Sequence, residues 1–228
     1  MIKTTNKMYT KTIKYPFGSC EIGVWEIDKS KYKSVSAMRI KAGTVFVYGR
    51  SEYVKLANTY GGCFAAKVDT AAGSFNTRKR GCRDGIYNWK NSALREEVHD
   101  EDRFAFFEEI AVTDLLWFDR DLTTADGDDY FGTCKDLVSI LTLDEYKKYG
   151  RLLPDTKEEI IDPDTGELTK TAFTRELLIT ASSRYGGLCN VVHPEKEIDQ
   201  DLLFFEPAQY RKVIVLRGDV KVLVEKEG

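Results

Sequence analysis

Alternation of apolar and polar residues predicts β-strands at both ends of the chain. The segment SCEIGVWEID (19–28) alternates closely enough to predict a strand, and SVSAMRIKAGTVFVYG (34–49) contains two β-rich runs hinged at residues 41–43. Near the other end, ELLITASS, DLLFFEP, RKVIVLRGD and KVLVEK are again rich in strand-forming residues, and Gly218-Asp219 predicts the last turn. Strands are therefore expected to dominate the beginning and the end of the chain.

The middle of the chain has a different pattern, which predicts short helices. SEYVKLANTYGG (51–62) is interpreted as a helix that begins at Ser51 and stops at Gly61 and Gly62. Residues 63–84 show weak periodicity and many turn-forming residues, which indicates an irregular segment. The first third of the chain is thus expected to pass from strands through one helix into loops.

A second helix is predicted within GIYNWKNSALREEVH (85–99). Asn91 or Ser92 can accept a hydrogen bond from the free N–H groups of the first helical turn, so either is a candidate cap. Trp89 lies just outside this cap, where an aromatic ring packs back onto Leu94 or Val98. The next segment, HDEDRFAFFEEI, predicts another short helix, capped at residue 100.

The clearest local signal is DLVSILTLDEYKKYG (136–150). A β-rich run ends at Thr142, and Glu145 three residues later completes a T-x-x-E capping box. Gly150 marks the end of the helix that this box begins. Further on, D-P-D-T-G separates two strand-like arms and predicts a hairpin near 157–170 that projects from the body.

Composition and charge exclude some classes of partner. The 228 residues carry a formal net charge of −3, with no apolar run long enough for a secretory signal or a membrane-spanning helix. We therefore expect neither a nucleic-acid nor a membrane partner, and a protein made in the cytoplasm without a signal peptide. One basic cluster, NTRKRGCR (76–83), is either a phosphate-docking segment or a solvated loop.

Candidate chemistry is sparse. The five cysteines are far apart and form no C-x-x-C motif, which argues against a zinc site or a disulfide framework. Neither His99 nor His193 lies in a nucleophile motif, so we expect a protein that is not an enzyme. The segment DRDLTTADGDDYFG offers Asp126, Asp128 and Asp129 as hard oxygen ligands for calcium, although the spacing is not that of an EF-hand. A solvated acidic loop is the alternative interpretation.

Two motifs resemble a bacterial and phage family of unknown function. They are W-x-x-S-x-L-R at Trp89, Ser92, Leu94 and Arg95, and D-x-V-x-x-L-T-x-x-E-x-x-K-Y over residues 136–149. The resemblance runs over roughly residues 12–217. That family is placed with C-type-lectin-like folds, beside the formylglycine-generating superfamily. The resemblance implies that the four named residues of the first motif, together with Thr142 and Glu145 of the second, are structural signature positions. It also implies that the chain is a non-enzymatic display or binding domain.

Together these observations predict a single α+β domain over residues 1–228, with C-type-lectin-like mixed sheets, short capped helices and long loops. The expected function is a non-enzymatic binding or assembly module, such as a capsid or tail component of a phage virion. Its partners would be other copies of itself or other particle proteins, with hairpin residues Ile160, Ile161 and Leu168 as assembly contacts. Two alternatives stay open: a lectin-like receptor module that binds a cell-surface glycan, and a metal-dependent or oxidative enzyme of the formylglycine-generating type.

Overall fold

The computed structural model describes most of the chain between residues 7 and 226. The described ranges are 7–15, 18–26, 28–73, 89–99, 110–155, 157–161, 168–173, 175–181, 183, 188–193, 196–203 and 208–226. In residues 7–15, 18–26, 72–73, 157–161, 168–173, 188–189 and 200–203 the course of the backbone is described and the side chains are not. All statements below concern these residues.

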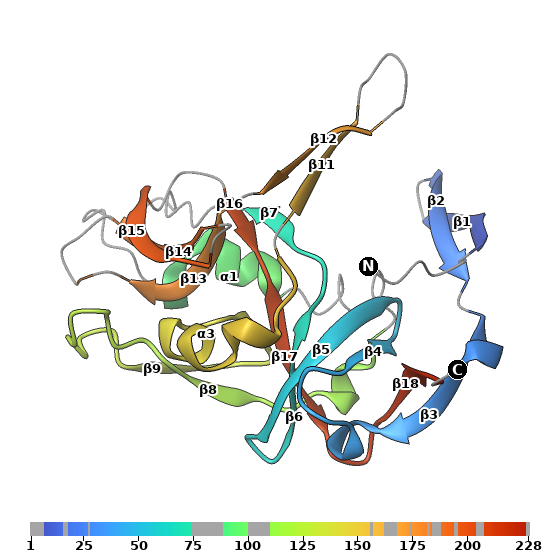
Figure 1. Ribbon diagram of the computed structural model, residues 1–228, viewed down its shortest axis with the longest axis horizontal. Coiled ribbons are helices and arrows are strands. Elements are labelled where there is room, and N and C mark those ends of the chain that lie inside the picture. Colours follow the sequence, from blue (N-terminus) through green and yellow to red (C-terminus); the bar gives the residue numbers. More distant parts are fainter. Residues whose placement is uncertain are drawn as a thin grey trace.

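The centre of the molecule is a seven-stranded antiparallel sheet (Figure 1). Its strands follow the order β10-β17-β6-β5-β4-β18-β3, so the last strands of the chain lie among the first. The strand bounds are β3 (Tyr32–Ser36), β4 (Val45–Tyr48), β5 (Ser51–Thr59), β6 (Gly62–Lys67), β10 (Val138–Ile140), β17 (Lys212–Arg217) and β18 (Lys221–Glu225). The β-rich runs predicted at 34–49 and in RKVIVLRGD and KVLVEK are confirmed as strands of this sheet. Those predicted in ELLITASS and DLLFFEP form β13 and the end of β15 in a second sheet.

The other strands form one five-stranded sheet and three two-stranded sheets. The five-stranded sheet has the order β15-β14-β13-β16-β7, in which β13 and β16 are parallel. Its members are β7 (Ala71–Gly73), β13 (Glu176–Ala181), β14 (Leu188–Val192), β15 (Ile198–Leu203) and β16 (Ala208–Tyr210). The two-stranded sheets are antiparallel: β1 (Lys7–Tyr15) with β2 (Gly18–Glu26), β8 (Phe118–Asp121) with β9 (Thr133–Asp136), and β11 (Lys157–Ile161) with β12 (Leu168–Phe173).

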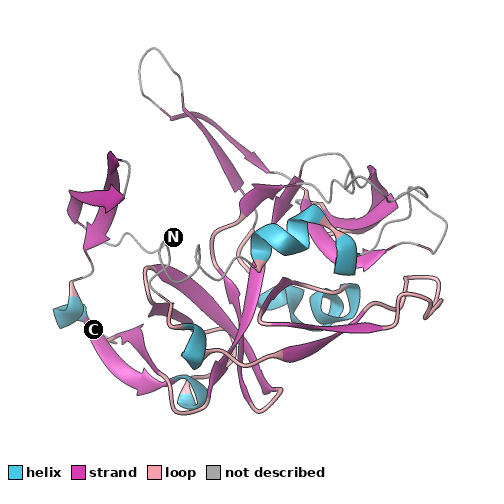
Figure 2. Ribbon diagram, turned by 180° about the vertical axis from the view of Figure 1, so that it is seen from behind, coloured by secondary structure: helices cyan, strands magenta, loops and turns pink. Residues whose placement is uncertain are grey.

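Helices are few and short in the described residues. They are α1 (Ala93–Val98) and α3 (Leu143–Tyr149), together with the 3-10 turns η1 (Lys29–Lys31), η2 (Ala37–Arg39), η3 (Trp89–Asn91), η4 (Val112–Asp114) and η5 (Gly150–Leu152). Strands account for 46% of the residues, and Figure 2 shows how sparsely helices are placed among the sheets. The fold is therefore rich in β-structure with several sheets and falls within the α+β or mainly β class.

Both capped helices begin where the sequence predicts. Ser92 accepts a hydrogen bond from the backbone N–H of Arg95 and caps α1. The capping box of α3 is complete, because Thr142 accepts from the backbone of Glu145 while the Glu145 carboxylate accepts from the backbone of Thr142. Gly150 is the C-cap of α3. The helix predicted from residue 100 lies, up to residue 109, outside the described residues.

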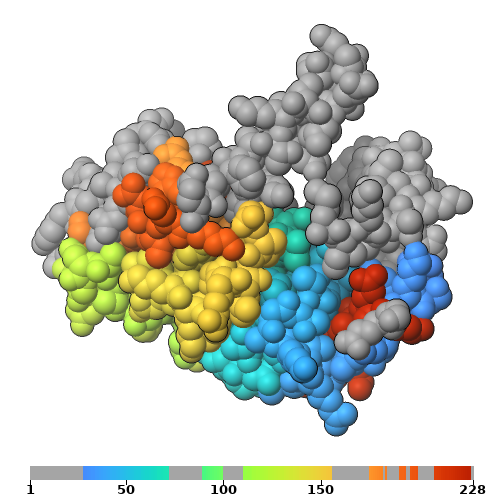
Figure 3. All heavy atoms as spheres, viewed as in Figure 1, coloured from blue at the N-terminus to red at the C-terminus, as the bar shows by residue number. Residues whose placement is uncertain are grey.

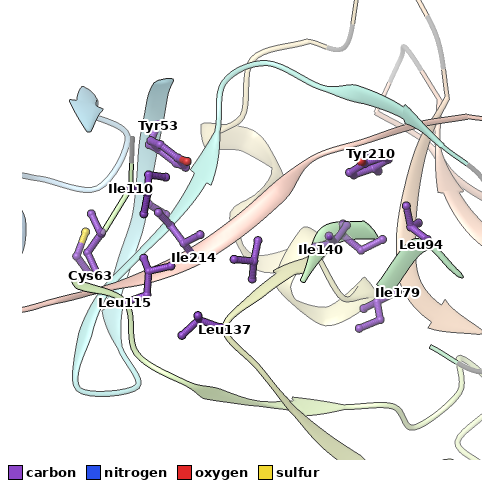
Figure 4. Close-up of a cluster of buried hydrophobic side chains, with 14 of the residues drawn as sticks. Tyr53, Cys63, Leu94, Ile110, Leu115, Leu137, Ile140, Ile179, Tyr210 and Ile214 are labelled. Atoms are coloured by element: carbon purple, nitrogen blue, oxygen red, sulfur yellow. The ribbon is translucent and has the colours of Figure 1, made fainter. Parts of the chain in front are cut away.

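The core lies on both faces of the central sheet. Along β17, Ile214 and Leu216 belong to one buried cluster, whereas Val213 and Val215 belong to a second. Because successive side chains of a strand point to opposite faces, the two clusters cover the two sides of the sheet. Helix α1 packs into the first cluster, part of which is drawn in Figure 4, and α3 packs into the second.

The prediction of a helix at residues 51–62 is wrong, because Ser51–Thr59 form strand β5. Val54 and Leu56 are two residues apart and belong to one core cluster, while Tyr53 packs in the other. That spacing is the period of a strand with both faces buried, and a helix does not produce it. Gly61, interpreted as a helix stop, instead lies in the β5–β6 hairpin turn with a φ of 79°, and Gly62 is the first residue of β6.

The interpretation of residues 63–84 as irregular is wrong for its first part, which contains β6 and β7. The small residues that suggested turns are required by close packing. A Cβ atom added to Gly62 would lie 2.2 Å from the backbone oxygen of Leu216 on the neighbouring strand. Cys63 and Ala65 face one core cluster, and Phe64 and Ala66 face the other. Residues 74–88, including the basic cluster at 76–83, lie outside the described part of the chain.

A buried ion pair connects the two large sheets. Arg211, just before β17, is fully buried with Glu176 of β13, and its Nε lies 3.2 Å from Glu176 Oε1. The same guanidinium donates to the backbone oxygens of Lys67, Val68 and Pro154. One side chain therefore joins four segments that are far apart in the sequence.

Candidate functional site

The two sequence motifs meet at Asp136, the last residue of β9. Its carboxylate is completely buried and accepts hydrogen bonds from Trp89 Nε1 and Ser139 Oγ at 2.7 and 2.8 Å. On the other oxygen, Arg95 Nε donates at 2.9 Å and His99 Nε2 lies 3.0 Å away. The β9–β10 corner thus holds η3 and α1 through a single carboxylate.

These contacts keep Asp136 ionised. Burial alone would raise its pKa, because a charge is poorly solvated in the protein interior. The interactions with His99, Trp89 and Ser139 outweigh burial, and the net pKa lies well below its ordinary value of 3.8. A buried carboxylate with this many donors is an organising centre for the surrounding segments.

Trp89 is therefore a core residue, with its ring 1% exposed and packed in the same cluster as Leu94 and Val98. Ser92 also donates through Oγ to the backbone oxygen of Trp89, 2.9 Å away, so the turn before α1 is fixed from two sides. The four signature residues of the first motif have local structural roles: a buried ring, a cap, a core contact and a partner of Asp136.

Replacing Trp89 with Phe is expected to lower the free energy of unfolding by about 1.5–3 kcal/mol, because Asp136 loses one donor while most of the ring remains. Chemical denaturation of both proteins measures this difference. The matched control is Trp117→Phe, since Trp117 is 55% exposed and its replacement is expected to change stability by less than about 0.5 kcal/mol. Equal effects at the two positions would contradict the role assigned to the Trp89 N–H.

A second buried charge pair lies at the beginning of α3. Arg120 of β8 is 1% exposed and contacts both oxygens of Glu145 at 2.6 and 2.7 Å. Its Nη2 also donates to the backbone oxygen of Ile140 at 2.6 Å. Burial alone would lower the pKa of Arg120, but the attraction of Glu145 outweighs it and raises the pKa. Glu145 therefore has two roles, one in the capping box and one as the counter-ion of Arg120.

A cleft of about 530 Å³ opens beside this pair. It lies between β8, the β8–β9 turn and the first turn of α3, whose atoms adjoin in Figure 3 as yellow-green and yellow spheres. Its size is within the range of small-ligand sites. The lining is rich in hydroxyl and charged groups: Tyr60, Asp119, Arg120, Asp121, Thr123, Thr124, Thr133, Thr142, Asp144, Glu145, Lys147 and Thr180.

Tyr60 brings an aromatic ring to the cleft from the β5–β6 turn. Its φ of 54° is in the left-handed region, which bulky residues rarely adopt. The ring packs on Phe64 and Phe118, its hydroxyl donates to Glu145 at 3.3 Å, and 44% of the residue is exposed. Burial first, and the charge of Glu145 second, raise the pKa of Tyr60, so the hydroxyl stays protonated.

The predicted calcium ligands are distributed along the β8–β9 turn. The Asp126 carboxylate accepts from the Thr124 hydroxyl, and the Asp128 carboxylate accepts from the backbone of Tyr130. Asp129 is exposed on the same turn. Nowhere in the described ranges does a group of three or more histidine, cysteine or acidic side chains lie together as metal ligands. The structure therefore adds no support to the calcium prediction.

The described thiols are not activated. Cys63 is fully buried and Cys134 is partly buried, and both are free. Burial is the main cause that raises the pKa of each to about 11. At neutral pH both are therefore thiols and not the thiolates that act as nucleophiles or metal ligands.

Sequence reasoning missed Arg120 and Tyr60. Arg120 was hidden among aspartates that suggested a solvated loop, although the run Phe118 to Leu122 alternates buried and exposed positions with Arg120 on the buried side. This period of two was the available signal. Tyr60 had no comparable signal, because its turn was interpreted as the end of a helix.

Comparisons of the chain with protein-family models, with curated proteins and with solved structures found no match. The C-type-lectin-like resemblance therefore stays a prediction from two motifs. In the part of the chain that the structure describes, no helix is both long and apolar enough to cross a bilayer.

Proposed function

We propose that the chain is a non-enzymatic assembly module that joins neighbouring copies of itself, or other proteins of a particle such as a phage capsid or tail, through its two-stranded hairpins. The observation that carries this proposal is that β11 and β12 form a separate two-stranded sheet, as do β1 and β2. Figures 1 and 2 show both ribbons standing away from the large sheets.

An isolated two-stranded hairpin of this kind is only weakly stabilised within a monomer. Two-stranded sheets are marginally stable in water, and each free edge offers unpaired N–H and C=O groups to another strand. Packing against a partner supplies the missing stabilisation. A hairpin outside the main sheets is therefore suited to contact a neighbouring subunit.

The strand register gives the hairpins apolar positions for such a contact. Ile161 pairs with Leu168 in the β11–β12 hairpin, and directly paired residues share a face. In the other hairpin Tyr9 pairs with Val24 and Ile13 with Cys20. The side chains of Ile160, Ile161 and Leu168 lie outside the described residues, so their role as assembly contacts stays a prediction.

Deleting residues 157–170 and joining the ends with a short glycine linker is expected to leave a folded protein with weakened assembly. The deletion removes β11 and the first half of β12, which form a sheet separate from the two large sheets, so it should affect association and not folding. Analytical ultracentrifugation over a wide concentration range measures association, and thermal unfolding measures folding.

A milder pair of variants separates the apolar contact from the deletion itself. Ile161→Asp places a charge at an apolar position of the hairpin, whereas the control Glu159→Gln changes the same strand without removing apolar surface. We expect Ile161→Asp to shift the protein toward the monomer and Glu159→Gln to leave association unchanged. A wild-type chain that is monomeric at every concentration, alone and with its particle partners, would contradict the proposed function.

A further inference from the structure

The cleft beside the Arg120–Glu145 pair is lined by more acidic than basic side chains. Four carboxylates line it, from Asp119, Asp121, Asp144 and Glu145, against two cations, Arg120 and Lys147. The charge of Arg120 is already compensated by Glu145 in a buried bidentate pair. Asp119, Asp121 and Asp144 are exposed, and Asp119 lies 4.0 Å from Lys135 in a pair whose side chains are both 70% exposed. The carboxylates of Asp119, Asp121 and Asp144 thus remain against Lys147 in the lining and Lys135 beside it, so the cleft has a net negative charge.

The geometry of the lining fits a cationic side chain. Carboxylates and hydroxyl oxygens accept hydrogen bonds from a guanidinium or ammonium group, and an aromatic face attracts the same cation. The partly exposed ring of Tyr60 lies at this cleft, held there by a left-handed backbone and by Phe64 and Phe118. Among the hydroxyls of the lining, Thr123 donates to the Asp121 carboxylate at 2.6 Å, and Thr180 accepts from the backbone N–H of Leu143 at 2.9 Å. The carboxylates and the Tyr60 ring are therefore the main groups for a cation. The cleft therefore suits a basic peptide more than an anion.

The chain itself contains a basic peptide of this kind. NTRKRGCR (76–83) has four cations and no acidic residue in eight positions, although the whole chain has a net charge of −3. The segment lies between Gly73, the end of β7, and Trp89, the start of η3. The cleft has room for a few side chains of such a segment but not for a folded domain.

We propose that the cleft binds the basic segment 76–83 of a second copy of the chain. This inference rests on the proposed assembly function and assigns a specific contact to it. Arginine side chains enter between Asp119, Asp121 and Asp144, and the contact is additional to that of the hairpins. Because the attraction is between exposed charges, it weakens as salt is added.

The test uses the full chain and a synthetic peptide of residues 75–84 with Cys82→Ser. Isothermal titration is expected to show saturable binding that is weakened by sodium chloride. The triple variant Asp119→Asn, Asp121→Asn, Asp144→Asn should bind the peptide about tenfold more weakly, a loss of about 1.4 kcal/mol, because three exposed charge pairs are removed. The matched control Asp69→Asn, Glu96→Gln, Glu225→Gln removes three acidic charges from positions outside the cleft lining, and its affinity should equal that of the wild type.

Three outcomes would overturn the inference. Equal affinity of the two triple variants would mean that the peptide responds to overall charge and not to this cleft. If the peptide binds to the Arg78→Gln, Arg80→Gln double variant of the full chain but not to the wild type, the segment fills the cleft of its own chain. Association of the full chain that is unchanged in the Arg78→Gln, Arg80→Gln variant would exclude this contact while leaving the hairpin-mediated assembly in place. Association of the full chain that depends on Arg78 and Arg80 but is unchanged by the deletion of residues 157–170 would instead refute the hairpin-mediated assembly and support this contact.

Discussion

Asp136→Asn is expected to lower the free energy of unfolding by about 3–5 kcal/mol, the cost of removing one partner from a buried charge pair. The carboxylate accepts from Trp89 and Ser139 on one oxygen and faces Arg95 and His99 on the other. An amide has one oxygen and one NH₂ group, so two of these donors would face another donor. Denaturant titration at neutral pH measures the loss.

The same variant gives a test that depends on pH. The pKa of Asp136 is lowered in the folded protein from its ordinary value of 3.8. Its stabilising contribution is therefore complete above pH 3.8 and is lost as the pH falls toward the lower folded-state pKa. We expect the difference in unfolding free energy between the wild type and Asp136→Asn to narrow below about pH 4. A difference that stays constant down to acid denaturation would contradict an ionised Asp136.

Glu145→Gln is expected to cost about 3–5 kcal/mol as well, because Arg120 would stay buried without its counter-ion. Glutamine at this position still completes a capping box, so the helix start is preserved and the effect is that of the charge. Denaturant titration measures the loss in this variant too.

The control is the double variant Arg120→Met, Glu145→Gln, which removes both charges. Replacing a buried ion pair by apolar atoms of similar volume is often neutral, so the double variant should be more stable than Glu145→Gln alone. If the double variant is instead less stable than Glu145→Gln, the loss of stability comes from packing or from the Ile140 contact and not from an unpaired charge.

Local signals in the sequence were sufficient for the helices and for many strands. The caps of α1 and α3 depend on residues three positions apart, so Ser92 and the Thr142–Glu145 pair specify where those helices begin. The terminal strands were recognised by alternation. These features require only interactions between close neighbours in the chain, which a sequence pattern reflects directly.

Features that depend on distant segments were not predictable. β5 is buried on both faces, so its apolar residues do not alternate cleanly, and its turn residues were consistent with the end of a helix. Arg120 is buried only because Glu145 and Ile140 come from another part of the chain to meet it. Asp136 is the first residue of a recognised motif, yet its contacts with Trp89, Arg95 and His99 become visible only in three dimensions. The cleft is lined by residues from four segments that are far apart in the chain, and it has no signature in the sequence.

The Arg211 contacts have a consequence for the kinetics of folding. Its acceptors lie at positions 67, 68, 154 and 176, so most of the chain must be in place before the guanidinium is satisfied. Because closing such long loops costs entropy, we expect these contacts to form after the folding barrier has been crossed. Weakening this side chain should accelerate unfolding and leave the folding rate nearly unchanged. We therefore expect Arg211 to affect the lifetime of the folded chain more than its rate of folding.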